Sequence, residues 1–328
     1  MRLVLGPRSR WALAIGLLGA AVGALGGCKP DIGKPPSLVE GPRLLAVRQT
    51  PPEVMPGATA SFEALVVDAA GAAGAPAVAW TLCKTPRPPT ESNSVSQACV
   101  VQPDDDAAMV GAVALAMPPD ACSLFGPDPP PVTPPIRPRD PDATGGFYVP
   151  VRAATQAAEG TNQIAFAFER IRCNLANAPG EVARAYNMTY VPNQAPAVAD
   201  VTLDPDGAAP VSLVAARDAV SAVVAPGAQV TLRVSWVPDA AETYVLYDSG
   251  SRTLVSPREA LRVSWFATDG RLEHDRTGRT GDEVDAFTDD VWTAPDDVAP
   301  GTVVHFWVVL RDDRGGVDFA SFDLTVGS

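Results

Sequence analysis

The stretch that decides the fold reads VAPGAQVTLRVSW and spans residues 224–236. A Pro-Gly turn opens it, and apolar residues then alternate with Thr231, Arg233 and Ser235. This period of two residues places successive side chains on opposite faces of a strand, one of them buried. The segment therefore predicts a β-strand that starts at a tight turn and covers a core with one face.

A similar stretch occurs earlier in the chain. Residues 54–62 read VMPGATASF and align without gaps with residues 224–232, again with a Pro-Gly turn ahead of a strand. A third such turn, at residues 299–301, precedes the apolar run at residues 303–310. The repeat indicates two strand-rich units, and the turn-rich segment 192–196 is the expected boundary between them.

Further short strands are expected between turns in both units. In the first unit they cover residues 77–83, 146–153, 163–173 and 186–191. In the second unit they cover residues 243–247, 261–268, 291–293, 303–310 and 319–326. No stretch combines a sustained helical period with a cap and a stop signal. The pattern predicts an all-β chain of two tandem antiparallel β-sandwiches.

The first 28 residues have the features of an export signal. Arg2, Arg8 and Arg10 precede an apolar stretch that ends in Leu-Gly-Gly-Cys at Cys28. A charged start, a short apolar zone and small residues ahead of a cleavage site are typical of a secretory signal peptide. An uncleaved transmembrane anchor is the alternative, but the stretch is glycine-rich and shorter than the roughly 20 apolar residues of a spanning helix.

This ending resembles the lipobox of bacterial lipoproteins, in which the cysteine sulfur carries lipid. The resemblance implies removal of residues 1–27, lipidation of Cys28 and anchoring in a lipid bilayer through N-terminal acyl chains. Lys29 is not the aspartate that accompanies inner-membrane retention in enteric-type lipoproteins, so we expect the outer membrane of a Gram-negative envelope. The proline-rich segment 28–40 is expected to be an extended, flexible tether.

Charge limits the possible partners. Loss of residues 1–27 leaves 22 basic against 38 acidic residues, a net charge of −16. Such a surface repels phosphate backbones, which argues against nucleic-acid binding. Acidic turns offer oxygen ligands that suit calcium, and the candidates are Asp204, Asp206, Asp312 and Asp313. Aspartate is also an ordinary turn residue, so solvated turns without any cofactor are the main expectation.

Four more cysteines follow the export signal, namely Cys83, Cys99, Cys122 and Cys173. An even number in an oxidising compartment predicts two disulfides, for which three pairings are possible. A zinc site is the alternative. However, no two of these cysteines have zinc-knuckle spacing, and His274 and His305 lie far from them in sequence.

The second unit carries a recognisable order of strands. A tryptophan strand around Trp265, a short strand at residues 291–295, a strand ending in Asp-Asp-Arg-Gly-Gly at residues 312–316 and a closing strand at residues 322–326 follow one another. They resemble the immunoglobulin-like repeats of bacterial surface proteins, especially the polycystic-kidney-disease type. The resemblance covers residues 195–328 and implies a β-sandwich there.

The expected domains are therefore one immunoglobulin-like sandwich at residues 41–192 and a second at residues 193–328. The first matches the family less closely, because a Cys- and Pro-rich insertion at about residues 84–144 follows its tryptophan strand. The proline run at residues 127–135 is expected to be a solvated loop. A polyproline ligand for an aromatic groove is the alternative.

The sequence points to no reaction. It lacks the nucleophile elbow, the His-Glu-x-x-His motif and the phosphate loop, and anchor, tether and two sandwiches account for its length. We expect a protein that is not an enzyme and has a binding, adhesion or structural role, with an envelope protein or a glycan as partner. The alternative is a carbohydrate- or cell-wall-binding accessory protein whose surface would use aromatic residues, namely Tyr244, Tyr247, Trp292 and Trp307.

Overall fold

A computed structural model describes residues 33–71, 78–92, 94–101, 107–109, 112–139, 143–156, 162–204, 209–214 and 222–327. Residues 36–328 form one compact unit. Cys28 and Asp206 lie outside the described residues. Among the residues that are described, no helix has both the length and the apolar character needed to cross a bilayer.

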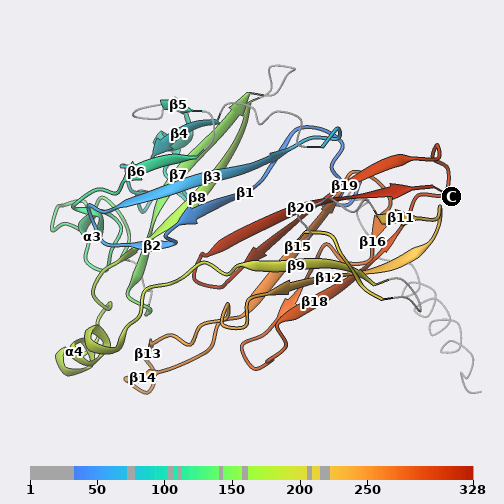
Figure 1. The fold of residues 1–328 in the computed structure, drawn as a ribbon. Helices are drawn as coiled ribbons and strands as arrows, with labels where there is room; N and C mark the ends of the chain where they lie inside the picture. Colours follow the sequence, from blue (N-terminus) through green and yellow to red (C-terminus); the bar gives the residue numbers. More distant parts are fainter. Residues whose placement is uncertain are drawn as a thin grey trace, which may run out of the picture. The chain divides into compact units, whose positions relative to one another are not determined.

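The first sandwich pairs a sheet of order β1-β3-β6 with a sheet of order β2-β8-β7-β4-β5 (Figure 1). Neighbouring strands are antiparallel except for β2 and β8, which are parallel. The strands are β1 (Arg43–Thr50), β2 (Glu53–Val54), β3 (Thr59–Val67), β4 (Val78–Leu82), β5 (Ala107–Met109), β6 (Val113–Ala116), β7 (Gly146–Gln156) and β8 (Asn162–Arg172).

The second sandwich pairs a sheet of order β10-β9-β12-β18-β16 with a sheet of order β11-β20-β19-β15-β17. Its strands are β9 (Val198–Asp204), β10 (Val211–Ser212), β11 (Ala222–Val224), β12 (Gln229–Trp236), β15 (Leu261–Ala267), β16 (Arg271–Leu272), β17 (Arg276–Arg279), β18 (Phe287–Thr293), β19 (Thr302–Arg311) and β20 (Val317–Val326). The predicted all-β sandwich class is confirmed.

The predicted Pro-Gly turns are also present. Gly57, Gly227 and Gly301 have φ angles of 77°, 71° and 86° and lie just ahead of β3, β12 and β19. Backbone in this left-handed region favours glycine, because a side chain there meets the following carbonyl oxygen. Each turn therefore fixes where its strand begins.

Each sandwich encloses its own aromatic core. In the second, Trp292 meets Phe306 edge-on with ring centroids 5.0 Å apart, and Phe306 stacks on Phe322 at 4.9 Å. In the first, the rings of Phe62 and Trp80 lie 6.0 Å apart. Buried aromatic pairs of this kind stabilise a core beyond their apolar area.

A third apolar layer joins the two sandwiches. Trp307 of β19 is only 1% exposed and packs with Val39 and Val67. Arg48 of β1 reaches across to β20, where its Nη1 lies 2.6 Å from Asp318 Oδ1 and its guanidinium covers the ring of Phe319. The sandwiches are therefore packed against each other along β1 and β20 rather than connected only by the chain.

One predicted strand is wrong. Residues 186–191 were expected to be extended, but Gly180–Thr189 form the helix α4. Half of its residues are good helix formers, and Val182 and Tyr186, four positions apart, share one face. That face packs in a small cluster with Tyr247 and Leu254. Figure 1 shows α4 beside the hairpin of β13 (Leu246–Asp248) and β14 (Thr253–Val255).

The chain between residues 37 and 40 also differs from the expected flexible tether. Leu38 forms a parallel bridge with Ala267 at the end of β15, and Val39 is fully buried. The N–H of Val39 donates to Ala267 O, and the N–H of Ala267 donates to Ser37 O. Apolar burial and paired backbone groups hold this segment to the second sandwich.

Candidate functional site

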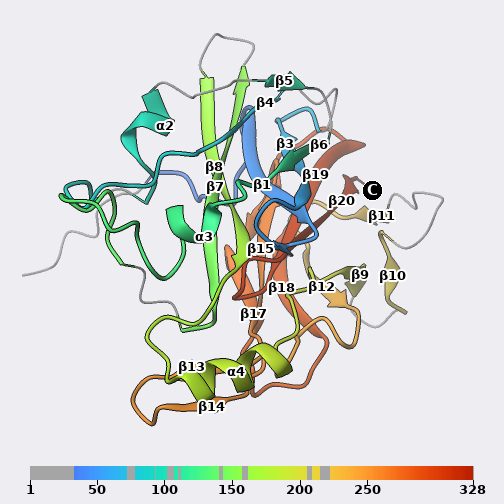
Figure 2. The same cartoon turned by 90° about the vertical axis from the view of Figure 1, so that its left-hand side faces the viewer.

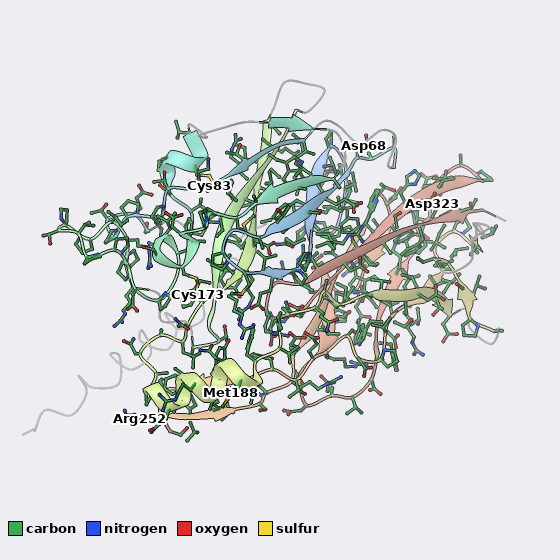
Figure 3. The ribbon with its side chains drawn as sticks, turned by 60° about the vertical axis from the view of Figure 1, so that its left-hand side comes forward. Asp68, Cys83, Cys173, Met188, Arg252 and Asp323 are labelled. Carbon is green, nitrogen blue, oxygen red and sulfur yellow. A yellow bond between two sulfur atoms is a disulfide. The ribbon has the colours of Figure 1, made fainter. Side chains whose placement is uncertain are left out.

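Two disulfides attach the insertion of the first sandwich to its sheet. Cys83, directly after β4, pairs with Cys99, and Cys173, directly after β8, pairs with Cys122. Figure 3 labels the two cysteines at the strand ends. The prediction of two disulfides is confirmed, and sulfur atoms joined in this way are not available as zinc thiolates.

The insertion lies against the β7-β8 side of its sheet. Figure 2 shows its short helices α2 (Gln97–Val101) and α3 (Ala121–Leu124) beside these strands. Arg137, which is 4% exposed, fixes the loop from within. Its guanidinium donates to the carbonyl oxygens of Pro138, Ser123 and Gly126 at 2.9, 3.0 and 2.6 Å. The loop is thus held by covalent bonds and by hydrogen bonds to a charged donor.

A cavity of about 620 Å³ lies between the insertion and the sheet. Residues 85–87, 94–96 and 137–139 form its walls, together with Phe125. The strands contribute Tyr148 and Pro150 from β7 and Phe168 from β8. Its volume is within the range of about 300–1,000 Å³ that is usual for small-molecule pockets.

Arginine supplies the charge in this cavity. Arg87, Arg137 and Arg139 line it, and none of the described lining residues is acidic. Arg87 donates through Nη1 to Glu91 O. Arg139 lies at the rim, half exposed, and its Nη2 is 2.6 Å from Asp128 Oδ1. The cavity is therefore positive within a chain that is acidic as a whole.

Tyr148 connects the cavity wall to the interior. Its ring lies under the guanidinium of Arg170 at 5.7 Å, and its hydroxyl accepts a hydrogen bond from Arg170 Nη1 at 3.1 Å. Arg170 in turn pairs with Glu53, its Nε 3.2 Å from Glu53 Oε2, and both side chains are 1% exposed. A buried ion pair is tolerated only where its remaining donors and acceptors are satisfied.

Tyr190 completes this buried pair. Burial raises the pKa of Tyr190 to about 12, so its hydroxyl stays protonated and donates to Glu53 Oε1 and Oε2 at 2.8 and 2.6 Å. The backbone N–H of Asn193 donates to the same carboxylate at 2.9 Å. Glu53 thereby holds the start of the segment that leads into the second sandwich.

A second buried pair holds that segment from the other side. Arg314 donates to Glu259, and its Nη2 lies 2.6 Å from Glu242 Oε2. Glu242 also accepts from the backbone N–H of Gln194 at 3.0 Å, and Val191 O accepts from Arg314 at 3.4 Å. Residues 191–194 are therefore clamped between Glu53 and Arg314, which fixes the joint between the sandwiches.

Glu169 is a buried acid of a different kind. It lies on the face of β8 that also carries Ala167 and Ile171 of the first core, and both of its carboxylate oxygens lack a hydrogen-bond partner among the described residues. Burial raises the pKa of Glu169 to about 8, and the nearby Glu53 adds to the rise. The side chain is therefore mostly protonated at neutral pH.

The predicted calcium ligands have other roles where the structure describes them. Asp312 Oδ1 accepts from the N–H groups of Arg314 and Gly316 at 2.9 and 2.7 Å, which shapes the turn from β19 to β20. Asp313 accepts from the N–H of Ala260 at 3.4 Å, and Asp204 is exposed at the end of β9. Calcium binding stays a prediction without support from these contacts.

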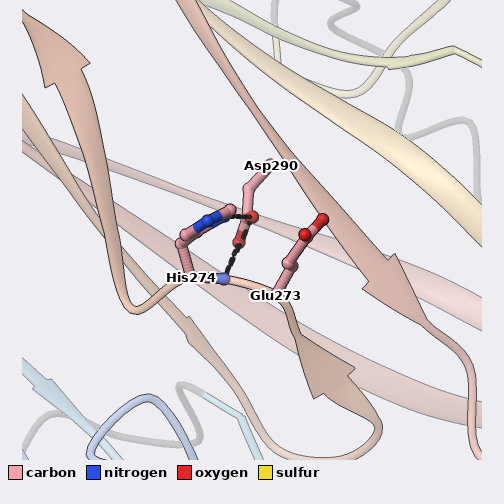
Figure 4. Close-up of side chains that lie close together, drawn as sticks. All are labelled: Glu273, His274 and Asp290. Carbon is pink, nitrogen blue, oxygen red and sulfur yellow. Dashed lines mark hydrogen bonds and ion pairs between the residues drawn. The ribbon is translucent and has the colours of Figure 1, made fainter.

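Glu273, His274 and Asp290 offer three ligand-type atoms within 4.8 Å of one another (Figure 4). The backbone N–H of His274 donates to both oxygens of Asp290, at 3.1 and 3.3 Å, and its ring Nδ1 lies 3.0 Å from Oδ1. Burial raises the pKa of Asp290, and the hydrogen bond from His274 opposes the rise. The buried carboxylate of Asp290 thus has its hydrogen-bond partners within the protein. We infer that the three residues stabilise the turn that follows β16 and do not hold a metal ion.

The aromatic residues considered for a glycan surface are mostly interior. Trp292, Trp307 and Tyr247 are buried, at 0%, 1% and 5% exposure. Tyr244 is partly exposed, with the guanidinium of Arg314 4.7 Å from its ring. They do not form an exposed platform on which a sugar ring can stack.

Sequence reasoning missed the cavity and its charge. Arg87, Arg137 and Arg139 are all the arginines of the insertion at residues 84–144. The available signal was their presence in an otherwise acidic, proline-rich loop bounded by cysteines. Only the disulfides and the fold of the loop bring residue 87 beside residues 137–139.

The chain matches no known protein-family model and no curated protein. Among solved structures, the adhesin InvE of Yersinia pseudotuberculosis aligns with a TM-score of 0.21 and 9% identity, over 85% of this chain and 58% of that one. Domains 4 and 5 of the S-layer protein SbsC align with a TM-score of 0.18 and 10% identity, over 87% and 100%.

Latent PorU from Porphyromonas gingivalis aligns with a TM-score of 0.21 and 11% identity over 88% of this chain. This chain covers 24% of PorU. TM-scores this low do not indicate a shared arrangement of strands. None of these similarities is therefore used to infer a function.

Proposed function

We propose that this chain is a lipid-anchored envelope protein whose two immunoglobulin-like sandwiches form a non-catalytic binding module. The observation that carries the binding role is the cavity of about 620 Å³ under the insertion. The insertion is joined to the sheet by disulfides at Cys99 and Cys122, and the buried Arg137 holds it from within. A preformed concave site with a few converging polar groups is the usual form of a ligand site.

The lining favours binding over catalysis. Its charged groups are arginines, which stay protonated at all physiological pH values. General acid–base chemistry near pH 7 requires a group that titrates there, usually His or a carboxyl of raised pKa. The described lining residues include neither. Arginine and aromatic side chains instead hold and orient a ligand.

Several observations support export and anchoring. The two disulfides suit an oxidising compartment outside the cytoplasm. Cys28 follows the apolar stretch of the export signal and precedes a proline-rich segment. Each buried acyl methylene contributes about 0.8 kcal/mol, so several chains together anchor a protein firmly. The buried clamp at residues 191–194 would present both sandwiches as one body at the end of this tether.

The test is a Cys28→Ser variant expressed in the native envelope. We expect it to leave the membrane fraction after a high-salt wash, whereas the wild type stays. A variant that still partitions with membranes would contradict anchoring through Cys28.

Affinity capture of the lipidated wild type, followed by identification of co-purifying molecules, tests the binding role. If the captured wild-type protein brings no specific molecule with it, a purely structural role would be favoured.

A further inference from the structure

We propose that the cavity between the insertion and the β7-β8 face binds a small organic carboxylate, with the charged group toward Arg87 and Arg139 and the apolar body against the aromatic wall. This inference rests on the proposed binding function and assigns the chemical class of its ligand.

The sign of the charge follows from the lining residues. The mature chain carries −16, and all three arginines of the insertion nevertheless converge on this cavity. No acidic side chain is among its described lining residues. Positive charge in a concave site with low-dielectric walls concentrates anions there. A cationic ligand would meet repulsion from the arginines with no acidic lining residue to offset it, and an anion gains most from this lining.

Donor geometry suits a carboxylate. Arg137 is used by the loop itself, because it donates to three backbone carbonyls. Arg87 makes one hydrogen bond, through Nη1, to the described protein, which leaves Nε and Nη2 for a ligand. Arg139 uses Nη2 for Asp128 and Nε for Pro127 O, and its Nη1 is left over. A guanidinium edge with two parallel N–H groups matches the two oxygens of a carboxylate.

Apart from the arginines and the hydroxyl residues Thr85, Ser94 and Ser96, the described wall is apolar or aromatic. Phe125, Tyr148 and Phe168 contribute three aromatic rings, and Pro86, Pro138 and Pro150 add flat, rigid surfaces. Such a wall has little to offer a second charged group but packs well against a ring or an alkyl chain. The volume of about 620 Å³ suits a small molecule better than a folded partner.

One carboxylate of the insertion competes for Arg139. The Asp128 carboxylate already occupies one edge of Arg139, with Oδ1 2.6 Å from Nη2. Asp128 is 76% exposed in its side chain, so its removal leaves the core untouched. A ligand carboxylate must share Arg139 with this residue. Replacing Asp128 by a neutral amide should therefore strengthen binding, while replacing either arginine should weaken it.

The probes are 3-phenylpropionate, its uncharged amide and phenyl phosphate. Each is titrated into the full lipidated chain in a non-ionic detergent at constant ionic strength, and empty micelles serve as the blank. Ligand-observed NMR gives the dissociation constant. We expect the carboxylate to bind and the amide to bind at least about tenfold more weakly, because it lacks the charge-assisted hydrogen bonds. Arg87→Gln and Arg139→Gln should each weaken carboxylate binding by about tenfold.

Two variants serve as controls. Asp128→Asn should tighten carboxylate binding, which loss of folding would not do. Arg262→Gln removes an exposed arginine of β15 in the second sandwich and should change nothing. Far-ultraviolet circular dichroism and the melting temperature of each variant confirm that it is folded.

Three results would overturn the assignment: equal binding of the acid and its amide, unchanged binding in both arginine variants, or preference for phenyl phosphate over the carboxylate. Absence of binding by all probes would overturn it as well. If the chain meanwhile stays in the membrane fraction and captures an envelope partner, only the ligand class fails and the proposed envelope function stands.

Discussion

Replacing Glu169 by methionine should stabilise the protein, and more so at high pH. Methionine keeps the length of the side chain but removes two oxygens that have no partner among the described residues. The residue faces the apolar core of the first sandwich, beside Ala167 and Ile171. A buried polar group without a hydrogen bond costs about 1–3 kcal/mol, so the variant gains stability even where the acid is protonated.

The pH dependence follows from the raised pKa of Glu169. Below the ordinary value of 4.5 both the folded and the unfolded chain hold the proton, so the group has no pH-dependent effect. Between 4.5 and about 8 the unfolded chain ionises while the folded chain stays protonated. The folded state then binds more protons, and stability falls as pH rises. Between pH 5 and pH 8 this loss amounts to about 3 kcal/mol.

Guanidinium denaturation followed by tryptophan fluorescence at pH 5, 7 and 8 measures the effect on the purified full chain. The difference in free energy of unfolding between Glu169→Met and wild type should widen by about 3 kcal/mol across this range. Glu181→Gln, an exposed acid on α4, is the matched control and should follow the wild type. A constant difference between Glu169→Met and wild type at all three pH values would refute the reasoning, since it would mean that Glu169 ionises normally in the fold.

Three further changes probe the joint and the turns. Trp307→Ala should cost about 3–5 kcal/mol and split the denaturation curve into two transitions, because this ring fills the layer between the sandwiches; a single unshifted transition would contradict this. Arg314→Met leaves the buried carboxylate of Glu259 and the partly buried one of Glu242 without their partner, and a loss of about 3–5 kcal/mol in urea denaturation is expected; a neutral effect would show that the clamp is dispensable. Gly270→Ala should lower stability more than Gly301→Ala. Both glycines have positive φ, where a side chain costs about 1–2 kcal/mol, but a Cβ added at residue 270 would also clash with the buried ring of Trp292 and the backbone oxygen of Thr293, whereas one at residue 301 would meet no neighbour; equal melting temperatures would argue against the clash.

Local patterns carried most of the fold prediction. The alternation after residue 229 and the three Pro-Gly turns are properties of a few neighbouring residues, and the strands β12 and β19 follow them closely. The helix α4 was missed because its one turn-to-turn pair, Val182 and Tyr186, is too short a pattern to stand out, and its stability comes from packing on residues some 60 positions later.

The sequence by itself determined the all-β class, the starts of key strands, the surplus of negative charge and the presence of an even set of cysteines. These depend on composition and on periods of two residues, which every short segment carries within itself. The tertiary structure decided which cysteines pair, how β1 packs on β20 and that Arg87 and Arg139, 52 positions apart in sequence, line one cavity. Such contacts depend on how the loops close and on which apolar faces of the sheets are still exposed when the sandwiches pack. No local sequence pattern encodes either.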